Sequence, residues 1–377
     1  MEFVLTEQQE MLRKMARDFL DTECPKSLVR EMVTDEKGYP DELWQKMAEL
    51  GWMGLIIPEE YGGEGASFYD LAVVLEEMGR ACLPGPFFST VVLGGLTILD
   101  AGSDKQKQEL LPRLAQGKLV LTLALTETEA RYTPGSVQVK AQPKGDEFVI
   151  QGTKLFTPDV HVADYIICVA RTKESNDPED GLTLFLVDSR SSGISYVPLQ
   201  TISGDKQFEV VFDSVKVSRE NILGTLDEGW TVMARVLEKA AVARCVEMVG
   251  GTRQVLEMTV DYARERVQFG RPIGALQAIQ HHCANIAIDV DSCALLSYQA
   301  AWRVSEGMPA GRETAMAKAW ISDRFKRLAT VAHQVHGAIG FTEDHDMPLY
   351  YKRAKTWELS LGDANYHFDK VATELGL

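Results

Sequence analysis

The spacing of apolar residues changes twice along the chain. In residues 1–119 apolar side chains recur every three or four positions, a spacing that predicts helices. The first helix should follow a T-x-x-Q capping box from Thr6 to Gln9, and Met11, Met15 and Leu20 are expected on its buried face. Further helices are predicted after Pro40, over residues 67–79, and from Ser103 to about Gly117.

From about residue 120 to residue 226 the pattern indicates strands. Short runs of β-branched and aromatic residues are separated by Gly, Pro, Asp and Asn, which are typical turn residues. The predicted strands cover residues 137–140, 147–151, 165–171, 183–187, 194–199 and 209–216. Six short strands in roughly 100 residues predict a small β-domain, either a sandwich or a barrel.

Helical spacing returns after Gly229 and continues to the end of the sequence. Long helices are expected over residues 230–268, 276–306 and 311–335, and a last one from about 347 to 377. Gly250 and Gly251 lie inside the first of these, where each costs about 1 kcal/mol relative to Ala, so we expect a close helix crossing there. The sequence therefore predicts an α+β protein with domains at 1–119, 120–226 and 227–377.

Composition narrows the classes of function. The chain has 377 residues, with 39 Lys+Arg against 55 Asp+Glu and a net charge of −16, which disfavours nucleic acid as a partner. There is no run of 18 apolar residues, no signal-peptide pattern and no C-x-x-C among the six cysteines. We therefore expect a cytoplasmic protein with reduced thiols and no membrane span. His281-His282-Cys283 has no companion at metal-ligand spacing, so no metal site is predicted.

Two segments of the C-terminal part could contact phosphate groups. A helix that ends in Arg264-Glu265-Arg266 before Gly270 presents guanidinium groups that can bind phosphate oxygens, although such arginines also cap helix carbonyls. Gly337 and Gly340 allow close approach of the backbone to a pyrophosphate or ribose. Each signal alone is weak, but their order along the chain carries more information.

Taken in order, the motifs resemble the acyl-CoA dehydrogenase family over essentially the whole chain. They are Thr126-Glu127, Gly145-Asp146-Glu147, Gly152-x-Lys154-x-Phe156, Tyr262-x-x-Glu265-Arg266-x-Gln268-Phe269-Gly270, Gln277-Ala278 and Gln334-x-x-Gly337 with Gly340-Phe341. The resemblance implies an N-terminal helical domain, a middle β-domain and a C-terminal four-helix bundle. It also implies FAD, held between the β-domain and the C-terminal helices and completed by a neighbouring subunit.

The resemblance further implies which residues contact FAD. Leu125 and Thr126 would face the isoalloxazine ring, and Phe156, followed by Thr157, stands where the family usually has Trp; a core Phe is the other interpretation. The residues that would serve a neighbour's FAD or the ADP end are Arg266, Gln268, Phe269, Gln277, Gln334, Gly337, Asp363 and Asn365.

The implied activity is α,β-dehydrogenation of an acyl-CoA thioester. In the family a carboxylate removes the α-proton while hydride leaves the β-carbon for flavin N5. The segment that usually carries this Glu aligns with residues 360–363, where Leu361 cannot accept a proton. The Leu361 backbone N–H could still bind the thioester oxygen, and Gly362 would line the same site. The family's second location for the base holds Ala240.

Two carboxylates could replace the missing base. Glu247 lies seven residues, about 10 Å, beyond Ala240 on nearly the same helix face, among apolar residues whose burial would raise its pKa. Arg244, a candidate substrate contact, would lower that pKa, and a plain Arg244–Glu247 ion pair is an open alternative. Asp363 is the second candidate for the base.

The segment 154–159 and the Leu-Gly-Asp at 361–363 resemble a subgroup that acts on cyclic, aromatic or steroid-like acyl-CoAs. The expected protein is an FAD-dependent acyl-CoA dehydrogenase that passes electrons to electron-transfer flavoprotein. It would be a homotetramer or dimer, or a heterotetramer with a homologous subunit. Two alternatives stay open: a non-catalytic, FAD-binding subunit, and a flavin oxidase or monooxygenase on the same fold.

Overall fold

A computed structural model describes residues 5–377, and the chain divides into two compact units. The first unit comprises the chain up to Glu31 together with Ser67–Leu83 and Ala241–Leu377, and the second comprises Met32–Ala66 and Pro84–Ala240. Each unit therefore combines segments that are far apart in the sequence. The division into domains at 1–119, 120–226 and 227–377 stays a prediction.

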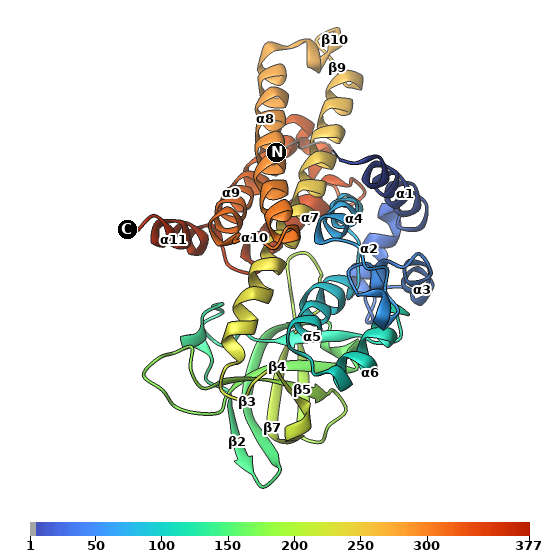
Figure 1. The fold of residues 1–377 in the computed structure, drawn as a ribbon. Coiled ribbons are helices and arrows are strands. Elements are labelled where there is room, and N and C mark those ends of the chain that lie inside the picture. Colours follow the sequence, from blue (N-terminus) through green and yellow to red (C-terminus); the bar gives the residue numbers. More distant parts are fainter. Residues whose placement is uncertain (1–4) are drawn as a thin grey trace. The chain divides into compact units, whose positions relative to one another are not determined.

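Helices make up most of the first unit (Figure 1). They are α1 (Glu7–Glu23), α4 (Phe68–Ala81), the later part of α7 (Gly229–Glu265), α8 (Gln277–Ser305), α9 (Gly311–His336), α10 (Met347–Leu359) and α11 (Ala364–Glu374), and α2 (Lys26–Thr34) begins here. Helix α9 contacts α8, α10 and α11, so α11 adds a fifth helix to the expected four. The predicted capping box of α1 is confirmed.

Glycines let α7 cross α4 with backbone against backbone. A methyl group added at Gly250 would lie 1.8 Å from the carbonyl oxygen of Glu76, and one added at Gly79 would lie 1.9 Å from that of Glu247. Gly251 faces the Phe325 ring, 2.7 Å from where its Cβ would be. The close crossing predicted from Gly250 and Gly251 is therefore confirmed.

The second unit is built on one sheet of eight strands. They are β1 (Leu121–Ala124), β2 (Lys140–Lys144), β3 (Glu147–Pro158), β4 (Tyr165–Arg171), β5 (Leu182–Asp188), β6 (Ile194–Leu199), β7 (Gln207–Ser218) and β8 (Ile222–Leu223). The strands pair in the order β6-β7-β3-β2-β4-β5-β8, and β1 pairs in parallel with β4. Because β5 contacts β7 across three intervening strands, the sheet curls around its own core, which favours the barrel of the two predicted arrangements. Helices α3 (Asp41–Glu49), α5 (Leu96–Ala101) and α6 (Asp104–Ala115) belong to this unit.

The strand predicted over residues 137–140 is wrong. The chain makes a short turn at Pro134–Ser136 and enters β2 only at Lys140. Val137 and Val139 are buried as expected, but the N–H groups of Gln138 and Val139 donate to the Glu127 carboxylate instead of to a neighbouring strand. A buried side chain has taken the place of a strand partner.

One predicted helix needs correction, and three helical segments were not predicted. The last helix does not run from 347 to 377, because α10 ends at Leu359 and α11 starts at Ala364. Leu361 and Gly362 between them have positive φ angles of 62° and 96°, which no α-helix accommodates. The π-helix η3 (Phe88–Gly95), α2 and α5 were not predicted; residues 89–95 are all buried, so this segment shows no polar face.

The buried face of α1 differs from the prediction. Leu20 is buried, but Met11 and Met15 are 67% and 43% exposed. The face toward α4 carries arginines instead, since Arg17 donates two hydrogen bonds of 2.9 Å to Glu77 of α4. Ion pairing, rather than methionine packing, therefore joins these helices at this point.

Candidate functional site

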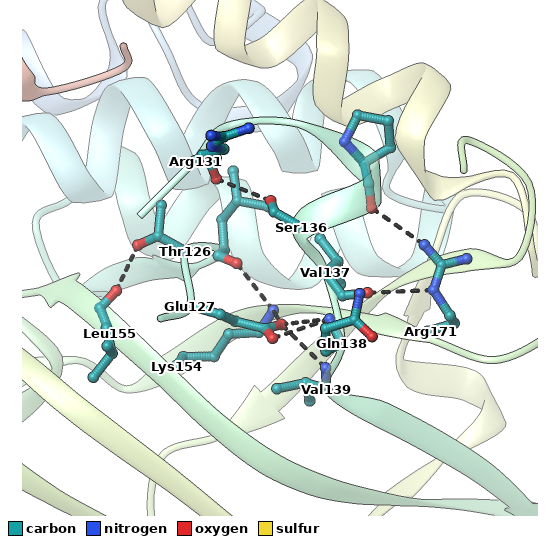
Figure 2. Close-up of polar contacts among 12 residues, drawn as sticks. Thr126, Glu127, Arg131, Ser136, Val137, Gln138, Val139, Lys154, Leu155 and Arg171 are labelled. Carbon is teal, nitrogen blue, oxygen red and sulfur yellow. Dashed lines mark hydrogen bonds and ion pairs between the residues drawn. The ribbon is translucent and has the colours of Figure 1, made fainter. Parts of the chain in front are cut away.

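In the second unit the chain after β1 lies against β3. The Leu155 N–H donates to the Thr126 carbonyl oxygen at 2.8 Å, and the Thr126 hydroxyl donates to the Leu155 carbonyl oxygen at 2.5 Å (Figure 2). Leu125 and Thr126 are both buried. The structure thus brings together the two segments, 125–126 and 156–157, that the sequence assigned to the flavin ring.

A buried ion pair fixes these two segments to each other. Lys154 Nζ lies 2.8 Å from Glu127 Oε1 and 3.0 Å from the Leu125 carbonyl oxygen, and the Lys154 side chain is fully buried (Figure 2). The Glu127 carboxylate also accepts from the N–H groups of Gln138 and Val139, at 3.0 and 3.1 Å. Both carboxylate oxygens of Glu127 and two of the three ammonium protons of Lys154 therefore have partners on neighbouring segments, which makes the arrangement rigid.

Phe156 and Thr157 fit the edge of a flavin. Phe156 is 45% exposed and has a φ of 54°, so the chain presents its ring outward instead of burying it in the sheet. This favours a stacking surface over the alternative of a core Phe. The Thr157 hydroxyl is buried and has no hydrogen-bond partner within the described residues, which leaves it available to a polar ligand atom.

In the first unit, the residues expected to serve a neighbour's cofactor gather at one end. Arg266, Gln268 and Phe269 lie at the tip where β9 (Val267–Gln268) and β10 (Arg271–Pro272) join α7 to α8 (Figure 1). Tyr262 stacks on His336, with ring centroids 4.6 Å apart, which places the end of α9 beside this tip. The rest of the predicted set here, Gln277, Gln334 and Gly337, is exposed, as are Arg266, Gln268 and Phe269.

The candidate base is buried and paired. Glu247 is 8% exposed, and its carboxylate forms an ion pair with Arg244 on the same helix. Burial raises the pKa of Glu247, although Arg244 and Arg353 act to lower it. The Arg244 guanidinium lies 5.6 Å from the ring centroid of Trp357, so Glu247 belongs to the same cluster as α10. The ion pair that the sequence left open is therefore present together with the raised pKa.

The turn between α10 and α11 contains Leu361, the position at which the resemblance would place a catalytic Glu. Leu361 and Gly362 are buried, and no acceptor for the N–H groups of residues 361–363 is found within the described residues. Asp363 is the N-cap of α11, and its carboxylate accepts from the Tyr366 N–H at 2.8 Å. This bond engages one oxygen of the second candidate base, and Asn365 in the first turn of α11 is exposed.

Two buried residues beside this turn were missed by the sequence interpretation. Lys318 of α9 is fully buried and donates to the Glu358 and Gly362 carbonyl oxygens, at 2.9 and 2.8 Å. His367 is 2% exposed and its Nε2 donates to the Leu361 carbonyl oxygen at 2.9 Å. A signal for Lys318 existed, because it falls seven positions before Phe325 on the apolar stripe of its helix, where a lysine is unexpected.

Replacing His367 by Gln is expected to make stability less sensitive to acid. Burial, and then the charge of Lys318, lower the pKa of His367 from 6.5 to about 3. Between pH 6.5 and about pH 3 the unfolded chain binds a proton at His367 and the folded chain does not. Stability that is present above pH 6.5 is therefore lost as the pH falls toward 3. Urea unfolding at about pH 7 and about pH 4 should show a smaller fall for the variant. Equal falls in both proteins would contradict this assignment.

Family models match almost all of the chain. The N-terminal domain of acyl-CoA dehydrogenase matches residues 6–118, the middle domain matches 122–215, and the C-terminal domain matches 227–376. A curated relative, the "Probable acyl-CoA dehydrogenase YngJ" of Bacillus subtilis, is 30% identical and aligned over 100% of both chains. The chain belongs to the acyl-CoA dehydrogenase family. The protein is thus an oxidoreductase acting on acyl-CoA, of a family of FAD-dependent flavoproteins.

Two further similarities bear on partners of acyl-CoA dehydrogenases. The "Caffeyl-CoA reductase-Etf complex subunit CarC" of Acetobacterium woodii is 29% identical over 95% of each chain. A chain of the ChsE4-ChsE5 complex from Mycobacterium tuberculosis superimposes with a TM-score of 0.91 and 29% identity, covering 100% of this acyl-CoA dehydrogenase chain and 99% of that one. In the described part of the chain, no helix has the length and apolar character needed to span a membrane.

Proposed function

We propose that this acyl-CoA dehydrogenase transfers hydrogen between the α and β carbons of a bulky or cyclic acyl-CoA and FAD, with Glu247 as the base. The observation that carries the proposal is the buried, pKa-raised carboxylate of Glu247 in a protein that lacks both usual bases. A raised pKa brings a carboxylate closer to the value that suits proton abstraction near neutral pH. The positive charge of Arg244 favours the ionised carboxylate of Glu247, which is the form that can accept a proton.

In the proposed reaction, FAD and the protein's own residues have separate roles. FAD, when bound, supplies the acceptor for the hydride that leaves the β-carbon. Glu247 takes the α-proton, so one C–H bond at each carbon is replaced by the C=C bond. The N–H groups of Leu361 and Gly362 hold the thioester oxygen while negative charge develops on it. Arg244 orients the Glu247 carboxylate through their ion pair.

The proposed FAD contacts are those that the family resemblance assigns, described here for each unit by itself. Leu125, Thr126, Phe156 and Thr157 would contact the ring, supported by the outward Phe156 ring and the unpartnered Thr157 hydroxyl. Arg266, Gln268 and Phe269 are exposed, Phe269 by 88%, and Arg266 lies about 28 Å along the chain axis of α7 from Glu247. This separation supports a role toward a neighbouring subunit's FAD. Gln277, Gln334, Gly337, Asp363 and Asn365 are proposed for the ADP end.

The acyl group is proposed to be bulky because the base has moved. Ala240 and Ala241 are buried and small where the family places a Glu and often an Arg, and Glu247 lies about two helical turns farther on. Because both alanine side chains are small, they occupy less space near the acyl group than the family's usual Glu and Arg would. Relatives are named both as a "Caffeyl-CoA reductase-Etf complex subunit" and as an "Acryloyl-CoA reductase", so the proposed size of the acyl group rests on the displaced base alone.

Anaerobic mixing with acyl-CoAs tests the proposed function. The FAD-loaded protein is mixed with linear, branched, cyclic and aromatic acyl-CoAs, and flavin absorbance is followed. We expect bleaching by at least one bulky thioester and much slower bleaching by butyryl-CoA. Failure of every thioester to bleach a fully loaded flavin would contradict the proposal. The pH dependence gives a second check: the bleaching rate should rise with pH through a pKa above 4.5.

We infer electron-transfer flavoprotein as the redox partner and an oligomer of this chain or of a homologous pair. The relative from Acetobacterium woodii is named as part of an Etf complex and as a reductase, so electrons could enter or leave through such a partner. The ChsE4-ChsE5 complex is the corresponding support for a two-subunit assembly. If this chain is instead the non-catalytic partner, it will bind FAD when purified alone but reduce none of it. Rapid reoxidation of the reduced flavin by O₂ would favour an oxidase.

A further inference from the structure

The turn that replaces the catalytic Glu is held from one side by two buried donors. Lys318 bonds to the carbonyl oxygens of Glu358 and Gly362, which bracket Leu361 in the chain, and His367 bonds to the carbonyl oxygen of Leu361 itself. Both side chains are at least 98% buried, so water does not compete for these carbonyls. Three carbonyls within five residues are therefore fixed in direction.

Fixing a carbonyl also fixes an N–H group. In a trans peptide the C=O and N–H bonds point in opposite directions, and none of the described peptide bonds is cis. The bonds to Leu361 and Gly362 therefore turn the N–H groups of Gly362 and Asp363 away from Lys318 and His367. Positive φ angles at residues 361 and 362 keep these residues out of the helices on either side. The N–H groups of Gly362 and Asp363 have no acceptor within the described residues.

The charge of Lys318 has no bonded carboxylate. Its third hydrogen bond goes to the Ser322 hydroxyl at 3.0 Å, so all three acceptors are neutral. Burial lowers the pKa of Lys318 to about 8; the charged or titratable groups that influence it are Cys245, Arg244, Glu358, Asp363 and His367. Burying an ammonium group in this way is costly, and an apolar side chain would serve packing better. Lys318 instead fixes the direction of the carbonyl groups that it binds and places a positive charge next to the turn.

We propose that Lys318 and His367 are positioning residues that hold the 361–363 turn so that its Gly362 N–H group faces the thioester oxygen and favours its enolate. The inference rests on the proposed function. Lys318 and His367 touch neither substrate nor cofactor; they act through the peptide groups that they hold. Their effect should therefore appear in how strongly the site stabilises an oxyanion, separately from proton transfer to Glu247.

Ionisation of bound acetoacetyl-CoA measures that effect directly. This thioester has an acidic α-proton between two carbonyls, and its enolate absorbs in the near ultraviolet, so the pH at which the bound ligand ionises reports oxyanion stabilisation. The FAD-loaded wild type should ionise the ligand at lower pH than free solution does. Lys318→Met should reduce the enolate fraction at a given pH by about tenfold or more, since one lost oxyanion contact costs roughly 10²-fold in catalysis.

His367 provides an independent pair of variants. His367→Leu removes the donor to the Leu361 carbonyl and should also reduce the enolate fraction, whereas His367→Gln keeps an N–H donor of similar reach and should restore it. Lys352→Met removes an exposed charge from α10 and should change nothing. If Lys318→Met does not fold, the comparison of His367→Leu with His367→Gln decides.

The outcomes separate two kinds of failure. If the wild type is bleached by an acyl-CoA and ionises acetoacetyl-CoA, but folded Lys318→Met and His367→Leu ionise it equally well, the positioning inference is overturned and the proposed function stands. If the wild type neither ionises acetoacetyl-CoA nor is bleached by any acyl-CoA, the proposed function is overturned and the inference falls with it.

Discussion

Replacing Glu247 by Gln is expected to lower the rate of flavin reduction by a bulky acyl-CoA at least about 100-fold, because a positioned base contributes roughly 10²–10⁴-fold. The amide keeps the size of the side chain and can still accept from Arg244, so folding and FAD content should be preserved. The measurement is the limiting rate of anaerobic flavin bleaching in stopped flow.

The matched control is Glu257→Gln. Glu257 lies ten residues farther along α7, and its carboxylate is about half exposed beside Arg80, at 3.9 Å. Removing this charge should leave the bleaching rate unchanged. A Glu247→Gln variant that bleaches as fast as the wild type would rule out Glu247 as the base, and Asp363→Asn would then be the next variant to measure.

Replacing Lys154 by Met is expected to destabilise the protein by about 3 kcal/mol and to weaken FAD retention. The change leaves the Glu127 carboxylate buried without its counter-charge, although the N–H groups of Gln138 and Val139 still reach it. The segments on either side of the ion pair carry Thr126 and the exposed Phe156 ring, so loss of the pair should also loosen the flavin. Urea unfolding and the ratio of flavin to protein absorbance measure the two effects.

Lys140→Met is the control for this prediction. Lys140 makes an ion pair with Glu174 of nearly the same length, 3.0 Å against 2.8 Å, but both of its side chains are more than half exposed. An exposed pair contributes at most about 1 kcal/mol. Adding Glu127→Gln to Lys154→Met should recover part of the loss, since the unpaired charge is then gone. Equal destabilisation by the two single variants would contradict the importance of burial.

Periodicity predicted the regular parts of the fold well. The strands over 165–171 and 194–199 coincide with β4 and β6, and the three long helices after Gly229 are found where expected. Failures occur where a distant group decides the local structure. The Glu127 carboxylate binds the backbone at 138–139, and the positive φ angles at 361–362 break the last helix. Neither effect is visible in the spacing of neighbouring residues.

The residues within motifs could be predicted from the sequence, but the buried residues that hold the turn at 361–363 could not. Motif resemblance supplied Thr126, Phe156 and Leu361, because each lies within a recognisable run. Lys318 and His367 escaped notice because they act on backbone carbonyls 40 and 6 residues away, on Glu358 and Leu361. A sequence motif records which side chains occur together, but it does not record which carbonyl a buried side chain reaches.

The crossing of α4 and α7 has a consequence for altering substrate range. Because Gly79 has no side chain, the Glu247 carbonyl group can contact the backbone of α4. This main-chain contact, and not the side chains around Glu247, fixes the position of Glu247 relative to α4. Mutating those surrounding side chains should therefore leave the position of the carboxylate unchanged. With Glu247 as the proposed base, such a scaffold would separate two properties that enzyme design usually has to trade against each other: where the proton is taken, and how large a molecule can present it.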